Sequence, residues 1–141
     1  MKLKILRKKT EDVKNFDIRE WKIADKEHFD SPTNWKEEKY YLLALDEKGK
    51  IIGTLGMEIE AGTAHVKTLI VSKDKQRQGI GKRLMEKAEK LSRKHRAHKV
   101  YLETGKDWQA AKFYKSLGYK ITAALPMHHF KNDYVMFSKF L

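Results

Sequence analysis

The sequence has no cysteine, only two prolines, and no apolar run approaching the roughly 18 residues that a membrane-spanning helix needs. Without cysteine there can be no disulfide framework, no thiol nucleophile and no thiolate metal site. The first nine residues lack the apolar core of a signal peptide. These absences exclude a disulfide-rich secreted domain and favour a cytoplasmic protein that does not enter a membrane.

Internal repeats, low-complexity tracts and linker-like segments are also missing. The 141 residues fit one domain better than two, because domains cluster at roughly 100–150 residues. With 40% hydrophobic residues, a chain of this length can bury about two-thirds of its unfolded surface. We therefore expect a single folded domain over residues 1–141.

Acidic residues are too few to balance the basic ones, 19 against 31, which leaves a formal charge of +12. Residues 71–100 hold eleven basic and three acidic residues, and so eight of the twelve excess charges. Such a field attracts a phosphorylated cofactor, a nucleic acid or an anionic surface. A solvated Lys-rich helix face is the equally simple alternative.

Alternating and helical periodicities predict the elements of the chain. We expect one or two helices over 10–29, a long helix over 79–95 and a shorter one over 107–117, with Gly118 just past its end. Strands are expected over 2–7, 39–45, 50–60, 64–71, 99–104, 119–123 and 134–140. This order predicts an α/β (α+β) fold.

The strand over 64–71 changes phase along its length. Ala64 and Val66 share one parity, whereas Leu69 and Val71 share the other. One extra residue near 67–68, a β-bulge, would return both pairs to one face of the sheet.

Directly after this strand, a basic turn leads to two glycines, Gly79 and Gly81, that open a helix. Free amides at a helix N-terminus carry partial positive charge, and glycines let an anion approach them closely. Two familiar phosphate motifs are excluded. No Gly-Lys-Ser/Thr follows at Walker A spacing, and Leu84 stands where a dinucleotide fingerprint needs its third glycine.

The segment Gln76-Arg-Gln-Gly79-Ile-Gly81 resembles the Q/R-x-x-G-x-G/A signature of the GNAT superfamily of acetyl-CoA-dependent N-acetyltransferases. About 30 residues downstream, the run from Asp107 to Tyr119 resembles that family's N-x-x-A-x-x-[LF]-Y-x-x-x-G-[FY] pattern. The two motifs have the family's order and separation, and the order of elements fits over nearly the whole chain.

The resemblance implies a single mixed, mostly antiparallel sheet with flanking helices and a bulged central strand splayed from its parallel neighbour. Acetyl-CoA would be the co-substrate, with its pantetheine arm in the gap between those strands. The cofactor-binding residues implied are Leu69, Ile70, Val71, Gln76, Arg77, Gln78, Gly79, Ile80, Gly81, Lys82, Asp107 and Tyr114.

Tyr114 matches the tyrosine that protonates the departing thiolate in this family, and packing is its alternative role. Asp107 departs from the family's asparagine. An ionised carboxylate cannot donate a hydrogen bond, so we expect Asp107 to cap the helix instead.

Attack by an amine also needs a base, because amines are mostly protonated at neutral pH. Candidates are Glu58, Glu60, His65 and Glu103, none of which lies in a signature, and we take Glu58 as the sequence-based choice. No convincing metal site is present.

The sequence thus predicts direct acetyl transfer to a primary amine, most simply on a small molecule. A protein Lys or N-terminal acetyltransferase, a non-catalytic acetyl-CoA-binding protein and a basic nucleic-acid-binding module are the alternatives. No nucleic-acid-binding signature supports the last. The sequence leaves a homodimer open.

Overall fold

The computed structural model describes residues 1–141, which form two compact units, Met1–Asn34 and Trp35–Leu141. The first unit contains helix α1 (Glu11–His28), which has no buried residue. Glu11 and Asp12 lie in its first turn, where the helix dipole favours negative charge. One helix thus occupies the predicted range 10–29. The single-domain organisation over 1–141 stays a prediction.

The strand predicted over 2–7 is wrong, because residues 1–10 form no strand or helix. Leu3, Ile5 and Leu6 are exposed, and no backbone ladder pairs this segment with another. Alternation in a sequence indicates only which side chains would share a face. A strand also needs a neighbouring edge to accept and donate its backbone hydrogen bonds.

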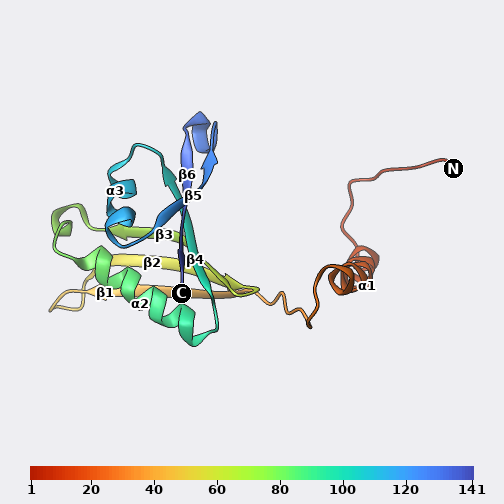
Figure 1. The fold of residues 1–141 in the computed structure, drawn as a ribbon, viewed down its shortest axis with the longest axis horizontal. Helices are drawn as coiled ribbons and strands as arrows, with labels where there is room; N and C mark the ends of the chain where they lie inside the picture. Colours follow the sequence, from red (N-terminus) through yellow and green to blue (C-terminus); the bar gives the residue numbers. More distant parts are fainter. The chain divides into compact units, whose positions relative to one another are not determined.

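The second unit is built on a six-stranded sheet in the order β1-β2-β3-β4-β6-β5 (Figure 1). Only β3 and β4 pair in parallel, and all other neighbours are antiparallel. The predicted mixed, mostly antiparallel sheet is confirmed. The strands are β1 (Glu38–Leu45), β2 (Ile51–Glu60), β3 (Thr63–Val71), β4 (Lys99–Gly105), β5 (Lys120–Leu125) and β6 (Tyr134–Phe140).

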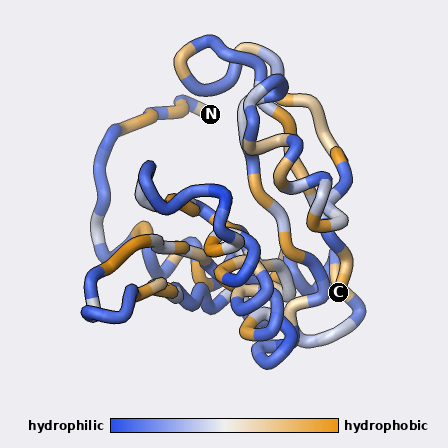
Figure 2. The backbone as a smooth tube through the Cα atoms, turned by 90° about the vertical axis from the view of Figure 1, so that its left-hand side faces the viewer, coloured by the Kyte–Doolittle hydropathy of each residue, from blue (hydrophilic) through white to orange (hydrophobic).

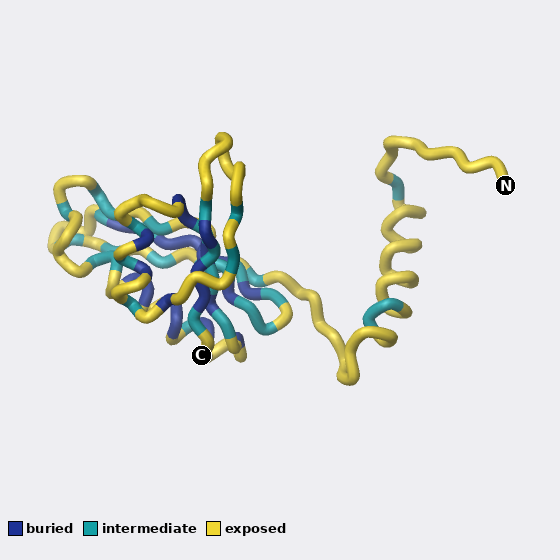
Figure 3. The backbone as a smooth tube through the Cα atoms, turned by 45° about the horizontal axis from the view of Figure 1, so that its top comes forward, coloured by how far each residue is buried: buried dark blue, intermediate teal, exposed yellow.

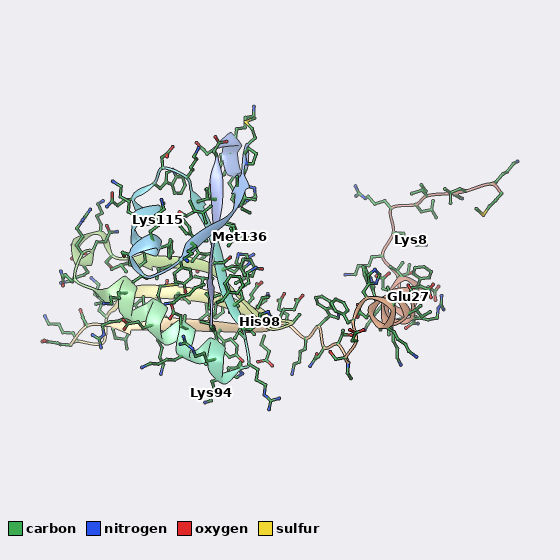
Figure 4. All side chains as sticks on the ribbon, in the orientation of Figure 1. Lys8, Glu27, Lys94, His98, Lys115 and Met136 are labelled. Atoms are coloured by element: carbon green, nitrogen blue, oxygen red, sulfur yellow. The ribbon has the colours of Figure 1, made fainter.

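Helices α2 (Ile80–Lys94) and α3 (Gln109–Ser116) confirm the two predicted amphipathic segments. Figure 4 labels Lys94 at the end of α2 and Lys115 on α3. Leu84, Met85 and Ala88 of α2 pack into one core with the buried side chains of the sheet. Gly118 follows Leu117, the C-cap of α3, and has a φ of +89°, as its predicted position past the helix end requires. Two short 3₁₀ turns, η1 (Lys73–Lys75) and η2 (His129–Lys131), complete the unit.

The core lies between this sheet and its two helices. Several strands contain strongly hydrophobic stretches, which are the orange parts of the backbone tube in Figure 2. Figure 3 shows the buried stretches within the second unit and an exposed turn between β5 and β6. We call the sheet face that carries Glu58, His65, Tyr101 and Glu103, opposite the buried residues that pack with α2, the open face.

The predicted β-bulge is confirmed in β3. Gly56 of β2 pairs with Thr68 and Met57 pairs with Val66, so Lys67 is the extra residue. The Thr68 hydroxyl oxygen accepts a hydrogen bond from the Gly56 amide (3.1 Å). The parallel ladder between β3 and β4 holds only three pairs and ends at His65 and Tyr101. Beyond the bulge, the two strands no longer pair.

Candidate functional site

A pocket of about 710 Å³ lies between the end of β3, the turn that leads into α2, and helix α3. Its apolar lining includes Leu69, Val71, Phe113 and Leu117, and its polar lining carries four cations. Those cations are Lys75, Arg77, Lys82 and Lys112. The pocket therefore suits a ligand that combines an extended, weakly polar arm with several negative charges.

The turn that leads into α2 is shaped for close approach. Gly79 has a φ of +82°, and a side chain placed there would meet no atom within 4 Å. The first bond of α2 runs from the Arg83 amide to the Gly79 carbonyl (3.1 Å). The amides of residues 80–82 precede that bond and have no acceptor within the helix. Together with the dipole of α2, they make an anion-binding end beside the pocket.

Tyr114 lines the same pocket from α3, and its side chain is largely buried. Its ring contacts Phe113, Tyr119 and Phe137. Burial raises the pKa of Tyr114 to about 12, so its hydroxyl keeps its proton at neutral pH. The Tyr114 hydroxyl forms no hydrogen bond within the protein. Every side-chain oxygen that is fully buried in this structure does have a hydrogen-bond partner, so the Tyr114 hydroxyl is not one of the fully buried oxygens. That hydroxyl is therefore accessible from outside.

The pocket brings together nine of the residues expected from the sequence. They are Leu69, Val71, Gln76, Arg77, Gly79, Ile80, Gly81, Lys82 and Tyr114. Ile70 and Gln78 do not line it, and Ile70 is exposed between the lining residues Leu69 and Val71, as strand alternation requires.

Asp107 also lies outside the pocket lining, and its expected role as a helix cap is wrong. Trp108 occupies the cap position of α3, and no side-chain hydrogen bond caps this helix. The Trp108 amide instead donates to the Gly105 carbonyl (3.2 Å), and the cap position of α3 lies one residue later than the sequence suggested.

Sequence reasoning missed most of the wall that α3 contributes. Gln109, Ala110, Lys112, Phe113, Ser116 and Leu117 all line the pocket. Ala110, Phe113 and Leu117 repeat at helical spacing, a signal that core packing explains equally well. A side chain at Gly81 would approach Phe113 to 3.3 Å, so glycine here lets α2 and α3 come together at the pocket.

A row of paired residues crosses the open face of the sheet. Lys39 pairs with Glu58, Glu58 with His65, and His65 with Tyr101 across four neighbouring strands. The Lys39 ammonium lies 3.8 Å from the Glu58 carboxylate. Glu103 reaches back from β4, and its carboxylate lies 2.6 Å from Nε2 of His65. Three of the four candidate bases thus gather where the parallel ladder ends, and Glu60 lies two residues from Glu58.

Similarity to solved structures shows the fold. An acetyltransferase from Bacillus cereus ATCC 14579 superposes with a TM-score of 0.77 at 20% identity, over 98% of both chains. An aminoglycoside 6'-N-acetyltransferase complexed with coenzyme A gives 0.66 at 20% identity, over 73% of both chains. The ribosomal-protein-S18-alanine N-acetyltransferase from Escherichia coli gives 0.64 at 21% identity, over 72% of this chain and 68% of that one.

Among curated proteins, none matches the sequence. None of the three helices is both long and apolar enough to cross a membrane. The model of the acetyltransferase (GNAT) family matches residues 10–119, which is most of the chain. The chain therefore belongs to the GNAT acetyltransferase family and is an acyltransferase.

Proposed function

We propose that the protein transfers the acetyl group of acetyl-CoA to a primary amine of a small molecule by direct attack, with no covalent enzyme intermediate. The observation that carries this proposal is the pocket, which joins free helix amides, four cations and an apolar lining beside the end of β3, past the point where β3 stops pairing with β4. The coenzyme A in the solved aminoglycoside acetyltransferase supports the choice of ligand.

Each end of the pocket has a role in this proposal. The amides of α2, with Arg77 and Lys82, bind the pyrophosphate, and the apolar lining holds the pantetheine arm. Tyr114 donates its proton to the thiolate as the carbon–sulfur bond breaks. The acceptor amine gives its proton to a base on the open face, where Glu58 is the sequence-based choice.

Two other functions remain as alternatives. A protein Lys or N-terminal acetyltransferase would use the same cofactor pocket, and the solved enzyme that modifies a ribosomal protein shares the fold. A nucleic-acid-binding module would use the basic outer face of α2. The pocket favours the enzyme, because several of its cations surround one concave site. Cytoplasmic location and oligomeric state stay predictions.

Substitution of Gly79 tests the cofactor site. Asparagine tolerates a positive φ, so Gly79→Asn fills the cradle with little backbone strain. We expect acetyl-CoA affinity, measured by calorimetry, to fall at least tenfold. Gly49→Asn is the matched control, because Gly49 has a φ of +79°, open space around it and a place outside the pocket lining. Unchanged affinity in Gly79→Asn would contradict the proposed site.

Melting temperatures of the wild-type protein with different ligands distinguish the enzyme from the nucleic-acid-binding alternative. Acetyl-CoA should raise the melting temperature of the wild type more than ATP or random duplex DNA does, because a bound ligand stabilises the folded state. Tight binding to DNA that weakens steeply with salt, together with no effect of acetyl-CoA, would favour the alternative.

A further inference from the structure

The His65–Glu103 pair lies where the gap between β3 and β4 begins. The parallel ladder ends at the pair His65–Tyr101, and the extra residue Lys67 follows two positions later. Ala64 and Val66, on either side of His65, are buried in the core under α2, so His65 projects to the open face. The imidazole thus lies at the closed end of the gap, on the face opposite the helices that form the cofactor pocket.

Two contacts fix the orientation and tautomer of this imidazole. The ring stacks on Tyr101 with the centroids 4.3 Å apart and the planes 13° from parallel. An ionised carboxylate can only accept a hydrogen bond, so Nε2 is the donor in the 2.6 Å contact with Glu103, and the lone pair of the neutral ring is then on Nδ1. Nδ1 of His65 has no hydrogen-bond partner in the protein. Every fully buried side-chain nitrogen does have such a partner, so Nδ1 is accessible on the open face.

The neighbouring groups are less suited to accept a proton. The ammonium of Lys39 lies beside Glu58, and an ionised carboxylate is in any case a weaker base than imidazole. Burial and the charges of Glu103, Glu60 and Glu58 raise the pKa of Tyr101, so its phenol stays neutral. Among these side chains, imidazole is the one that most often accepts and releases protons in catalysis near neutral pH.

We propose that His65 is the general base of the transfer and that Glu103 positions it, with the acceptor amine arriving on the open face. The inference rests on the proposed function and names the base within it. Nδ1 takes one proton from the ammonium, and the Glu103 carboxylate stabilises the imidazolium. The free amine attacks the thioester carbonyl, a carbon–nitrogen bond forms, and the carbon–sulfur bond breaks.

The protons balance in this scheme. The nitrogen loses two protons between ammonium and amide. One of these protons returns to Tyr114 and replaces the proton that Tyr114 gave to the thiolate. The second proton passes through His65 to solvent. Substrates and products are therefore the ammonium and acetyl-CoA on one side, and the amide, coenzyme A and one proton on the other.

The test compares variants of His65 and its neighbours in the full-length protein. The matched control is His95→Gln, because the ring of His95 also faces a glutamate, 3.6 Å from Glu38. Glu58→Gln tests the sequence-based choice, and Glu103→Gln removes the charge behind the imidazole. Acetyl-CoA binding is measured by calorimetry, and kcat/KM is measured from pH 6 to 9.5 with spermidine, kanamycin and a lysine peptide as acceptors.

We expect His65→Gln to bind acetyl-CoA normally and to lose about 10²–10⁴-fold in kcat/KM at pH 7. The loss should shrink toward pH 9.5, where more of the amine is already neutral. Glu103→Gln should lose on the order of tenfold, and imidazole ¹⁵N shifts should show a single Nε2–H tautomer in the wild type but a mixture in this variant.

Each contrary outcome has a distinct meaning. If the wild type neither binds acetyl-CoA nor acetylates any of the three acceptors, the proposed function fails and the inference fails with it. If the wild type is active and His65→Gln keeps its kcat/KM at pH 7, or loses no more than His95→Gln, only the inference is overturned. A large loss confined to Glu58→Gln would return the role to Glu58.

Discussion

Burial keeps the Tyr114 phenol protonated at neutral pH, and it also makes that phenol a weaker acid. Its aromatic surroundings hold the pKa at about 12, yet its hydroxyl stays accessible from outside. A thiol of ordinary pKa, about 8.5, is already a tolerable leaving group as thiolate at neutral pH. In the proposed transfer, protonation by Tyr114 therefore accelerates the reaction without being indispensable.

Removal of the Tyr114 hydroxyl measures that acceleration. We expect Tyr114→Phe to lower kcat by roughly ten- to a thousand-fold, with little change in acetyl-CoA affinity, because the ring and its packing are kept. Steady-state kinetics with saturating acetyl-CoA, beside calorimetry of binding, make the comparison. Full kcat in the variant would reduce Tyr114 to a packing residue, whereas lost affinity with unchanged kcat would make it a binding residue.

At the scale of elements, one buried carboxylate joins α2 to the last strand and to the end of α3. The Tyr119 hydroxyl donates to Glu89 (3.0 Å), and the Lys139 ammonium donates to both Glu89 oxygens (3.1 and 3.2 Å). Lys139 also donates to the carbonyl of Leu117 (3.1 Å). These bonds hold together the two helices that form the pocket.

Loss of this carboxylate should destabilise the fold. Glu89→Ala leaves Lys139 and the Tyr119 hydroxyl without their acceptor. We expect the free energy of unfolding to fall by about 2–4 kcal/mol, which is less than for a fully buried pair because water still reaches Lys139. Urea denaturation gives the value. Glu20→Ala removes an exposed ion pair with Arg19 and should cost under about 0.5 kcal/mol. Equal losses in both variants would contradict this reading.

Patterns within one element were enough to predict much of the fold. The phase change between Ala64–Val66 and Leu69–Val71 located the bulge, because a strand that buries one face must keep its parity. The helical period of α2 and the glycine after α3 were equally local signals. The strand expected over 2–7 failed for the opposite reason, since its existence depended on a partner edge elsewhere.

The site was predicted only where a motif covered it. Gly79, Gly81 and Tyr114 lie in such motifs and line one pocket. The contact between His65 and Glu103 joins residues 38 positions apart on parallel strands. Its register comes from the packing of the whole sheet, so composition and spacing could name the two residues as candidates without pairing them.

The molecule as a whole carries buried phenols that link its stability to alkaline pH. Burial raises the pKa of Tyr114 to about 12, and burial with the Glu89 charge raises that of Tyr119 further. In the unfolded chain, both phenols ionise near pH 10. Above that pH the unfolded state binds fewer protons than the folded state, so stability falls as pH rises.

We therefore expect the tyrosine contribution to be intact below about pH 9 and to decline from pH 10 through 12. The loss by pH 11 should be on the order of 1 kcal/mol for each phenol. Urea denaturation at pH 8 and pH 11, with tyrosinate absorbance as a second signal, gives the measurement. Tyr114→Phe should show a smaller decline than the wild type. Equal declines would mean that other groups, such as lysines, dominate the alkaline limb.

The bulge in β3 also bears on how this fold can change by mutation. The gap between β3 and β4 begins beside Lys67, the one residue of β3 that has no partner on β2, and the side chain of Lys67 is exposed. The identity of that residue is therefore nearly free, whereas its presence is not. We expect substitutions of Lys67 to have almost no effect in a mutational scan. Deletion of its codon would instead restore unbroken pairing between β2 and β3 and close the gap between β3 and β4.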